Sequence, residues 1–375
     1  MLLLCGCELV VGITDRHVFL ASGGSPATGG GPASGGSGAG GGDYCAGDLS
    51  CDPNGCGVEG HDCLGGECLE GSCQPRIIAR PTAPSSLAVL GSYVYWGYRS
   101  KAPSEIHACD KMGCGEDGYE VFLTGVSEVS RLVTYGSTLF IVVQGNPLGV
   151  FFGCEGSTEC TPVFSTSALN GPTAIAASGE TTYLATIGDE LGLNGGLYRC
   201  TGADCTDPPP IEKFRGTALA VDAGHLYWID LDFGSVFRCD PDDCIASSHV
   251  VVTDAVISGS DLHAKDGWLT FAGSAGNLYR CQVSEAGECD DVVTLATTDS
   301  QLAGFVLDET HAYFAEKSKY PRAILRVPLA GGSVETVVRD LIDVIELAQD
   351  DDAIYWLSSG TGNEGVVGKV AKPPG

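Results

Sequence analysis

One recurring pattern constrains the fold of this chain more than any other feature. Between Ala218 and Cys244, a run of small residues precedes the aromatic run Leu226-Tyr227-Trp228, a polar loop and then Val236-Phe237-Arg238-Cys239. Aligned on Tyr227, the pattern occurs at Tyr95, Phe140, Tyr183, Tyr227, Thr270, Tyr313 and Tyr355, with spacings of 45, 43, 44, 43, 43 and 42 residues. Four short strand-like pieces repeated at such a period predict the blades of a β-propeller.

The composition agrees with an all-β chain rich in turns. The 375 residues include 54 Gly, no apolar period of helical spacing is sustained, and β-branched and aromatic residues alternate in short runs. The net charge of −28 argues against nucleic acid and anionic membrane surfaces as partners. The same charge predicts a soluble monomer.

The last repeat unit is short by one strand. It runs from Ile345 through Val370 and ends without the fourth strand of the other units. The segment Arg76–Arg80 has the fourth-strand pattern, and Ile78 lies 43 residues, one period, before Val121 of the first unit's fourth strand. We therefore predict that residues 76–375 form a seven-bladed β-propeller closed by its N-terminal strand, because closure removes free sheet edges.

The 18 cysteines indicate an oxidising compartment. Ten of them follow the third strands of five units in close pairs, where a chain that doubles back comes within disulfide reach. The sixth unit has Gly331-Gly332 at this turn instead, which favours a structural role for the pairs. The predicted disulfides are Cys109/Cys114, Cys154/Cys160, Cys200/Cys205, Cys239/Cys244 and Cys281/Cys289.

Residues 43–75 form a second cysteine-rich region. A segment this small has no core of its own, so we expect disulfides to hold it together. It resembles a miniature EGF-like or Dickkopf-like module, and its pairing stays open. A zinc site is the rival interpretation, although no CxxC pair is present and only His61 lies nearby. Its six cysteines are Cys45, Cys51, Cys56, Cys63, Cys68 and Cys73.

The N-terminal residues 1–22 contain Leu4-Cys5-Gly6-Cys7, which resembles a bacterial lipobox. The resemblance implies cleavage before Cys7 and lipidation of that residue. Only six residues precede Cys7 and none is basic, so we expect the true translation start to lie upstream of Met1. The alternative is a short apolar N-terminus with free thiols at Cys5 and Cys7. Residues 23–42, almost all Gly, Ser, Ala and Pro, predict a flexible linker behind such an anchor.

No catalytic pattern stands out among the polar residues. The sequence has no Ser/His/Asp set, HExxH motif or phosphate loop, so it predicts no catalytic residue, no metal and no cofactor. His225 and His311 occupy the same repeat position, two residues before the aligned aromatic, which favours packing. Acidic clusters at Asp230/Asp232, Asp240/Asp242/Asp243 and Asp350/Asp351/Asp352 are expected to be solvated loops, with calcium binding as the alternative.

Tyr227-Trp228-Ile229-Asp230 followed by Val236-Phe237-Arg238 resembles the YWTD repeat of low-density-lipoprotein-receptor class B propellers. Tyr95-Trp96 and Tyr355-Trp356 match only its aromatic pair. The resemblance implies a propeller beside a cysteine-rich module. That family has six units and seven are counted here, so its receptor partners do not carry over. The whole layout also resembles bacterial lipoproteins with a cysteine module and a propeller.

These features predict a lipoprotein of the cell envelope that presents a propeller face to a protein or glycan, without catalysis. Its ligand, its membrane and its leaflet are not encoded in any motif. A metal-dependent lactonase or lyase is the alternative, but the inner strands are mostly small and apolar, with Glu346 and Asp261 as the nearest acidic candidates. A purely structural spacer is a third interpretation.

The predicted binding face carries the loops between second and third strands, opposite the cysteine loops. These loops are longer and more varied, as expected where function sits on a rigid scaffold. The candidate residues are Asp189, Glu190, Asp230, Asp232, Lys317 and Lys319.

Overall fold

The computed structural model describes the following residues: 54–98, 105–114, 118–126, 128–143, 149–155, 159–166, 172–188, 195–201, 210–212, 216–230, 232–253, 261–273, 276–289, 291–317, 322–359 and 364–374. For 149–155 and 159–166 it describes the backbone alone. Several predictions fall outside these residues: lipidation at Cys7, the linker 23–42, and roles for Cys45, Cys51, Asp189, Glu190, Cys205 and Lys319. No helix in the described part of the chain is both long and apolar enough to cross a membrane.

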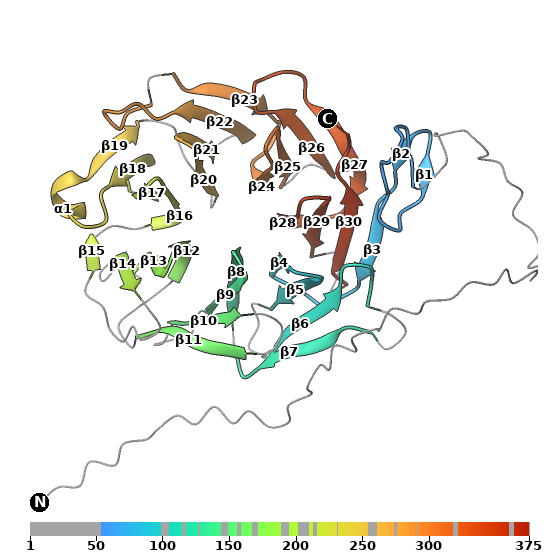
Figure 1. Cartoon of the computed structure of the whole chain (residues 1–375), viewed down its shortest axis with the longest axis horizontal. Coiled ribbons are helices and arrows are strands. Elements are labelled where there is room, and N and C mark those ends of the chain that lie inside the picture. Colours follow the sequence, from blue (N-terminus) through green and yellow to red (C-terminus); the bar gives the residue numbers. More distant parts are fainter. Residues whose placement is uncertain are drawn as a thin grey trace, which may run out of the picture.

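Four-stranded antiparallel sheets stand around a common axis, each with its first strand innermost (Figure 1). The first three sheets along the chain are β4 Ser86–Leu90, β5 Tyr93–Gly97, β6 Glu105–Asp110, β7 Glu120–Thr124; β8 Val129–Tyr135, β9 Thr138–Val143, β10 Gly149–Glu155, β11 Glu159–Thr166; and β12 Pro172–Ser178, β13 Thr181–Thr186, β14 Gly196–Thr201, β15 Pro210–Glu212. The next three are β16 Gly216–Asp222, β17 His225–Asp230, β18 Ser235–Cys239, β19 His249–Val252; β20 Leu262–Lys265, β21 Trp268–Ala272, β22 Asn277–Gln282, β23 Val293–Thr297; and β24 Leu302–Leu307, β25 His311–Glu316, β26 Arg322–Pro328, β27 Glu335–Leu341. The last sheet combines β28 Val344–Gln349, β29 Ala353–Ser358 and β30 Val366–Ala371 with β3 Arg76–Ala79.

The predicted seven-bladed propeller needs a correction. Six of these sheets are complete blades in which side chains of all four strands are described, whereas β8–β11 has side chains described only for β8 and β9. In the second unit Gly153 lies opposite Phe140, where the fourth unit has Arg238 opposite Tyr227, and Pro162 lies in the outer strand. The structure thus establishes six complete blades and a further four-stranded sheet at the position of the second unit.

The aromatic residues of the second strands form the core between neighbouring sheets. Trp96, Trp228 and Trp356 are at most 2% exposed, as is expected where both faces of a strand are covered. Each such side chain stabilises the fold by about 1.5–3 kcal/mol through burial alone. One cluster, for example, joins Tyr227 and Ile229 of β17 to Leu269 and Phe271 of β21.

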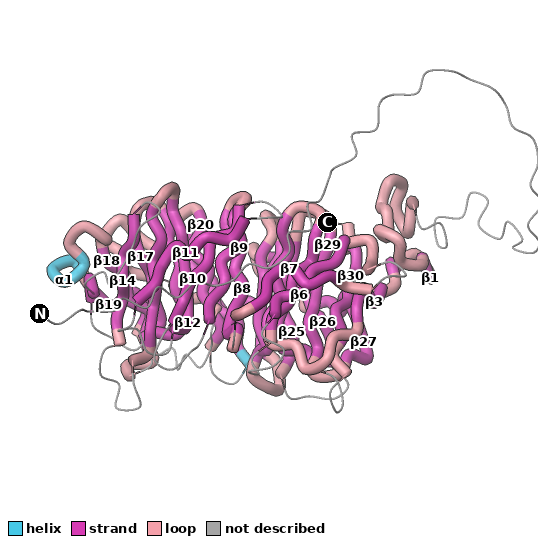
Figure 2. Tube along the Cα trace, turned by 90° about the horizontal axis from the view of Figure 1, so that it is seen from below, coloured by secondary structure: helices cyan, strands magenta, loops and turns pink. Residues whose placement is uncertain are grey.

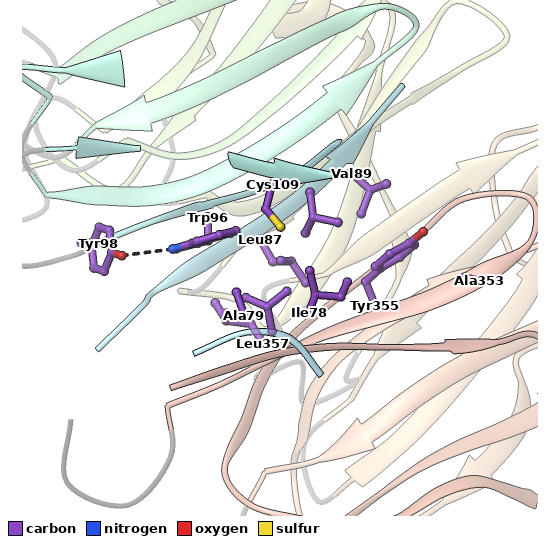
Figure 3. Close-up of a cluster of buried hydrophobic side chains, with 12 residues drawn as sticks. Ile78, Ala79, Leu87, Val89, Trp96, Tyr98, Cys109, Ala353, Tyr355 and Leu357 are labelled. Atoms are coloured by element: carbon purple, nitrogen blue, oxygen red, sulfur yellow. Dashed lines mark hydrogen bonds between the residues drawn. The ribbon is translucent and has the colours of Figure 1, made fainter. Parts of the chain in front are cut away.

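The closing strand is β3. It pairs antiparallel with β30, with Arg76 opposite Lys369 and Ala79 opposite Val367, so the last sheet is built from both ends of the propeller sequence. A closure cluster, shown in Figure 3, packs Ile78 and Ala79 against the first sheet and against Tyr355 and Leu357 of β29. Both the hydrogen bonding and the apolar packing therefore join the start of the chain to its end.

The cysteine-rich module packs beside the last sheet. Its short hairpin, β1 Cys68–Leu69 and β2 Ser72–Cys73, is held by the disulfides Cys56–Cys68 and Cys63–Cys73. The His61 ring fixes the module to the propeller, with Nδ1 2.9 Å from the carbonyl oxygen of Cys56 and Nε2 2.9 Å from that of Lys372. The four described cysteines are thus bonded to one another.

Disulfides also close the turns between third and fourth strands. Cys109–Cys114, Cys239–Cys244 and Cys281–Cys289 are bonded, and these are three of the five predicted pairs. Cys200 is disulfide-bonded as well. Cys154 and Cys160 are backbone partners in the β10–β11 ladder. The single short helix, α1 Cys244–Ser247, lies in one of these turns within the described residues.

Four cations near the ends of third strands each contact the next sheet around the ring. Their contacts lie in the segment that follows the third strand of that sheet, and we call these four residues the clamp cations. The contacts run from Arg199 to Asp242 Oδ1, from Arg280 to the Leu329 carbonyl at 2.8 Å, from Arg326 to the Pro373 carbonyl at 3.0 Å, and from Lys369 to Met112 Sδ at 3.5 Å. The repeated arginine of the sequence is therefore a link between blades.

Candidate functional site at the channel mouth

A cavity of about 510 Å³ runs along the axis of the ring. It is lined by the inner strands β4, β8, β12, β16, β20, β24 and β28, which Figure 1 shows around the centre. Most lining residues are alanine, valine and leucine. Small side chains on the inner strands leave this space open, and such concave, mostly apolar spaces with a few polar groups are typical of ligand sites.

The two ends of the channel differ because every sheet is antiparallel. The first-to-second and third-to-fourth turns share one side, which we call the cysteine-loop face. The other connections share the opposite side, the mouth face; Figure 2 shows the strands running between the two. Inner strands begin at the mouth face and end at the cysteine-loop face.

Three charged residues lie at the mouth end of the channel wall. They occupy the same repeat position. Each lies two residues before the inner-strand residue that pairs with the aligned residue of the second strand. These pairs are Val133–Phe140, His263–Thr270 and Ala348–Tyr355. Equivalent positions in neighbouring blades stand at the same depth. These mouth residues are Arg131, Asp261 and Glu346.

The first two of these residues form an ion pair across the channel. Arg131 Nη2 lies 3.0 Å from Asp261 Oδ1, and each side chain is 22% exposed. Arg131 is in β8 and Asp261 directly precedes β20, and their sheets are separated by two others along the shorter way around the ring. The pair therefore bridges opposite walls of the channel instead of joining adjacent blades.

Backbone features position the two carboxylates. A Cβ atom on Gly304, at the same depth in β24, would lie only 3.1 Å from Asp261 Oδ2, so glycine provides room for this carboxylate. Glu346 Oε2 accepts a hydrogen bond from the Leu87 backbone N–H at 2.8 Å. This contact joins the last sheet to the first at the channel wall.

His263 lies deeper in the same wall. Its ring packs 4.8 Å from the Phe305 ring, measured between centroids. Burial lowers the pKa of His263, while the negative charge of Asp261 acts in the opposite direction. The histidine is consequently neutral at pH 7, and the charged residues of the described channel wall, one cation and two carboxylates, sum to −1.

The predicted face residues have different roles in the structure. Asp230 is 4% exposed, and its Oδ1 accepts the Asp232 N–H at 2.8 Å and the Phe233 N–H at 3.3 Å. It therefore shapes the loop at the mouth face, while Asp232 is exposed beside it. Phe233, at the same loop, is 72% exposed. Lys317 is exposed at the mouth end of β25.

Sequence reasoning missed Arg131 and Phe233. The repeat alignment held the signal for Arg131, because it shares its column with Asp261 and Glu346. The exposed aromatic had no such signal, since the repeat pattern does not separate buried from exposed loop residues.

The acidic clusters on the other face serve as turns. Asp350 Oδ1 accepts the N–H groups of Asp352 and Ala353, at 3.0 and 2.8 Å, and its other oxygen pairs with Lys111. Asp240 Oδ1 accepts the Asp242 N–H at 2.9 Å. The first carboxylate of each cluster is thus a local turn-forming group, as is common for aspartate.

Among the described residues, the sulfur atoms of Cys56, Cys63 and Cys73 lie close enough together to hold a metal ion. These sulfur atoms are in the disulfides Cys56–Cys68 and Cys63–Cys73, which leaves no thiolate to bind zinc. The channel carboxylates form no such set in the described part of the chain.

Comparisons with known proteins bear on the fold. YCF48, in a structure bound to D1 peptide, is similar at a TM-score of 0.56 and 10% identity, over 80% of this chain and 95% of that one. PorZ, an essential bacterial surface component of the type-IX secretion system of Porphyromonas gingivalis, gives 0.52 and 15% over 80% of this chain, but the match spans only 39% of PorZ. The computationally designed Ika8 protein gives 0.52 and 13%, over 79% of this chain and all of that one.

The likeness is one of fold. The similar structures are β-propeller proteins, and sequence identities this low do not show a shared function. No protein-family model matches the sequence, and no curated protein matches it significantly.

Proposed function

We propose that this chain is a non-catalytic binding scaffold that holds a protein segment at the mouth face of its propeller. The cavity of about 510 Å³ with its cross-channel ion pair carries the proposal. Its walls offer apolar contact and its mouth offers fixed charges, which suits recognition of a partner. The structure of YCF48 with D1 peptide supplies an example of a peptide-bound neighbour of this fold. A glycan is the competing ligand class.

Two exposed apolar residues in the connections of one repeat unit allow a matched test of the binding face. Phe233 is 72% exposed at the mouth face, and Ile245 is 76% exposed in α1 at the cysteine-loop face. A photo-crosslinking residue placed at either position in the full chain should capture a protein partner only from position 233. Adducts formed mainly from position 245 would reverse the assignment, and labelled glycan captured at 233 in place of protein would change the ligand class.

Disulfides in both the module and the propeller support a location outside the reducing cytoplasm. The finer proposal is a lipid-anchored protein of the cell envelope, facing the periplasm or the exterior. It rests on the lipobox resemblance at Cys7 and on the Gly/Ser-rich segment that follows. Mass spectrometry of the envelope fraction should find a diacylglyceryl cysteine at position 7 as the mature N-terminus. A mature end at Met1 or Cys5 would contradict it.

A further inference from the structure

The mouth of the channel carries an arrangement suited to one kind of ligand group. In ring order, the sheets of Asp261, Gly304 and Glu346 are consecutive, and the three residues stand at the same depth. The glycine thus lies between two strands that each carry a carboxylate. Because it has no side chain, the Asp261 carboxylate can lie against it, with Oδ2 only 3.1 Å from where a Cβ atom would be. We call these three residues the acidic notch.

Electrostatics favours a cation there. Among the described residues lining the cavity, the formal charges sum to −1, and the whole chain carries −28. An approaching anion would be repelled by both, whereas a cation would be attracted along the channel axis. The Arg131 guanidinium already occupies one side of Asp261, which shows that this carboxylate accepts a guanidinium at hydrogen-bond distance.

The wall below the notch suits the stem of a basic side chain. Ala264, Ala348 and Leu307 line the channel on the same three inner strands, deeper than the carboxylates. Lysine and arginine place methylene groups along apolar surface while their charged ends stay with polar groups. A neutral polar side chain would gain less from the carboxylates, and an aliphatic one would desolvate them without compensation.

We infer that the acidic notch takes an arginine or lysine side chain from the protein segment bound at the mouth face. This inference rests on the proposed function and names the chemistry of its ligand. The incoming cation would contact Asp261 and Glu346 and compete with Arg131 for the first of them. Arg131 then acts as an internal counter-ion that keeps Asp261 paired when no ligand is bound.

The test uses a matched pair of peptides with the full-length protein. Acetyl-Gly-Arg-Gly-amide is the probe, and its citrulline counterpart has nearly the same shape without the charge. Isothermal titration calorimetry should show saturable binding of the arginine peptide and at least about tenfold weaker binding of the citrulline peptide, the effect of one charge-assisted hydrogen bond. Equal affinities for the two peptides would overturn the inference.

Four variants and one control locate the binding. Glu346→Gln and Asp261→Asn should each weaken arginine-peptide binding about tenfold, and Gly304→Ala should weaken it without changing any charge. Asp242→Asn, which removes an exposed carboxylate on the cysteine-loop face, is the control and should leave affinity unchanged. Arg131→Gln should strengthen binding, because it removes the competing cation. Unchanged affinity in both Glu346→Gln and Gly304→Ala, or equal loss in Asp242→Asn, would show non-specific attraction to an acidic protein.

The two proposals fail separately. If crosslinking at position 233 captures a protein but the arginine peptide does not bind, the scaffold function stands and the acidic notch does not. If the peptide binds and crosslinking yields nothing from position 233, the acidic notch is supported as a cation site and the proposed protein-binding face is not.

Discussion

The cysteine-loop face and the mouth face of the propeller differ in how their polar groups are used. On the cysteine-loop face, disulfides close the turns, clamp cations reach the next sheet, and Asp350 and Asp308 order turns through backbone hydrogen bonds. On the mouth face, the ion pair between Arg131 and Asp261 spans the channel between opposite walls. One face links neighbouring blades, and the other keeps fixed charges around a cavity.

This difference indicates a division of labour within one repeat. The same four-stranded unit provides both faces, so stability and recognition can be altered separately. Substitutions at the cysteine-loop face should change the free energy of unfolding, while those at the mouth should change binding. The following predictions test that separation, from the largest expected effect to the smallest.

The largest effect is expected at the closing strand. Ile78→Ala removes a buried side chain, 7% exposed, from the closure cluster, and should lower the free energy of unfolding by about 2–5 kcal/mol. Ile77, its neighbour in β3, is 45% exposed, so Ile77→Ala should change stability by less than about 0.5 kcal/mol. Urea unfolding of both variants checks the difference. Similar losses in the two would mean that the strand contributes through backbone pairing alone.

Removing one disulfide should have the next largest effect. The double variant Cys239→Ala, Cys244→Ala opens a short loop and should cost about 2–3 kcal/mol. Phe233→Ala lies in the same repeat unit at the mouth face and should leave the melting temperature unchanged, since its side chain is mostly exposed. Calorimetric melting of both variants compares the two faces within one blade. A larger fall in melting temperature for Phe233→Ala than for the double cysteine variant would contradict the separation of stability and recognition between the two faces.

A clamp cation should contribute less. Arg280 donates to the Leu329 carbonyl and stacks 4.3 Å from the centroid of Trp268, so Arg280→Met should cost about 1–3 kcal/mol. Lys317→Met, an exposed cation at the mouth face, is the control and should be nearly neutral. Chemical denaturation measures both. An unaffected Arg280→Met variant would mean that the clamp orders the turn without stabilising the fold.

The smallest effect depends on pH. Burial opposes ionisation of Asp350, but hydrogen bonds from Lys111 and the Ala353 N–H outweigh it and hold the pKa below its ordinary value of 3.8. The ionised group therefore stabilises the fold above its ordinary pKa, and this contribution is lost as the pH falls through the lowered value. The wild-type protein should exceed Asp350→Asn in stability at pH 6, and the difference should shrink below about pH 4. A difference that stays constant down to pH 2 would contradict this origin.

Sequence reasoning reached the parts of the fold that repeat. The period placed the second strands, and the missing strand after Val370 pointed to Arg76–Arg80, because each unit needs the same four pieces. The close spacing of Cys239 and Cys244 was likewise enough to predict a bonded turn. All of these follow from local pattern and from one period applied along the chain.

The rest depends on distances that only a closed ring defines. Arg131 and Asp261 are 130 residues apart, and nothing local shows that opposite walls bring them to 3.0 Å. Asp230 was predicted as an exposed face residue from its loop, yet its side chain turns inward to bind backbone N–H groups. Seven units were counted from the aromatic positions, while the structure gives six complete blades, because an aromatic position marks only the second strand of a unit and carries no information about its outer strands.

The pairing of β3 with β30 also has a consequence for how the protein is made. The strand synthesised first has its partner about 290 residues later, so it stays without its ladder until nearly the whole propeller has emerged. Contacts this distant in sequence slow folding, and an unpaired strand edge is open to wrong partners meanwhile. The small module next to β3 folds through its own local disulfides, so it can be complete early. The unpaired β3 would then extend from a folded module until β30 has been synthesised.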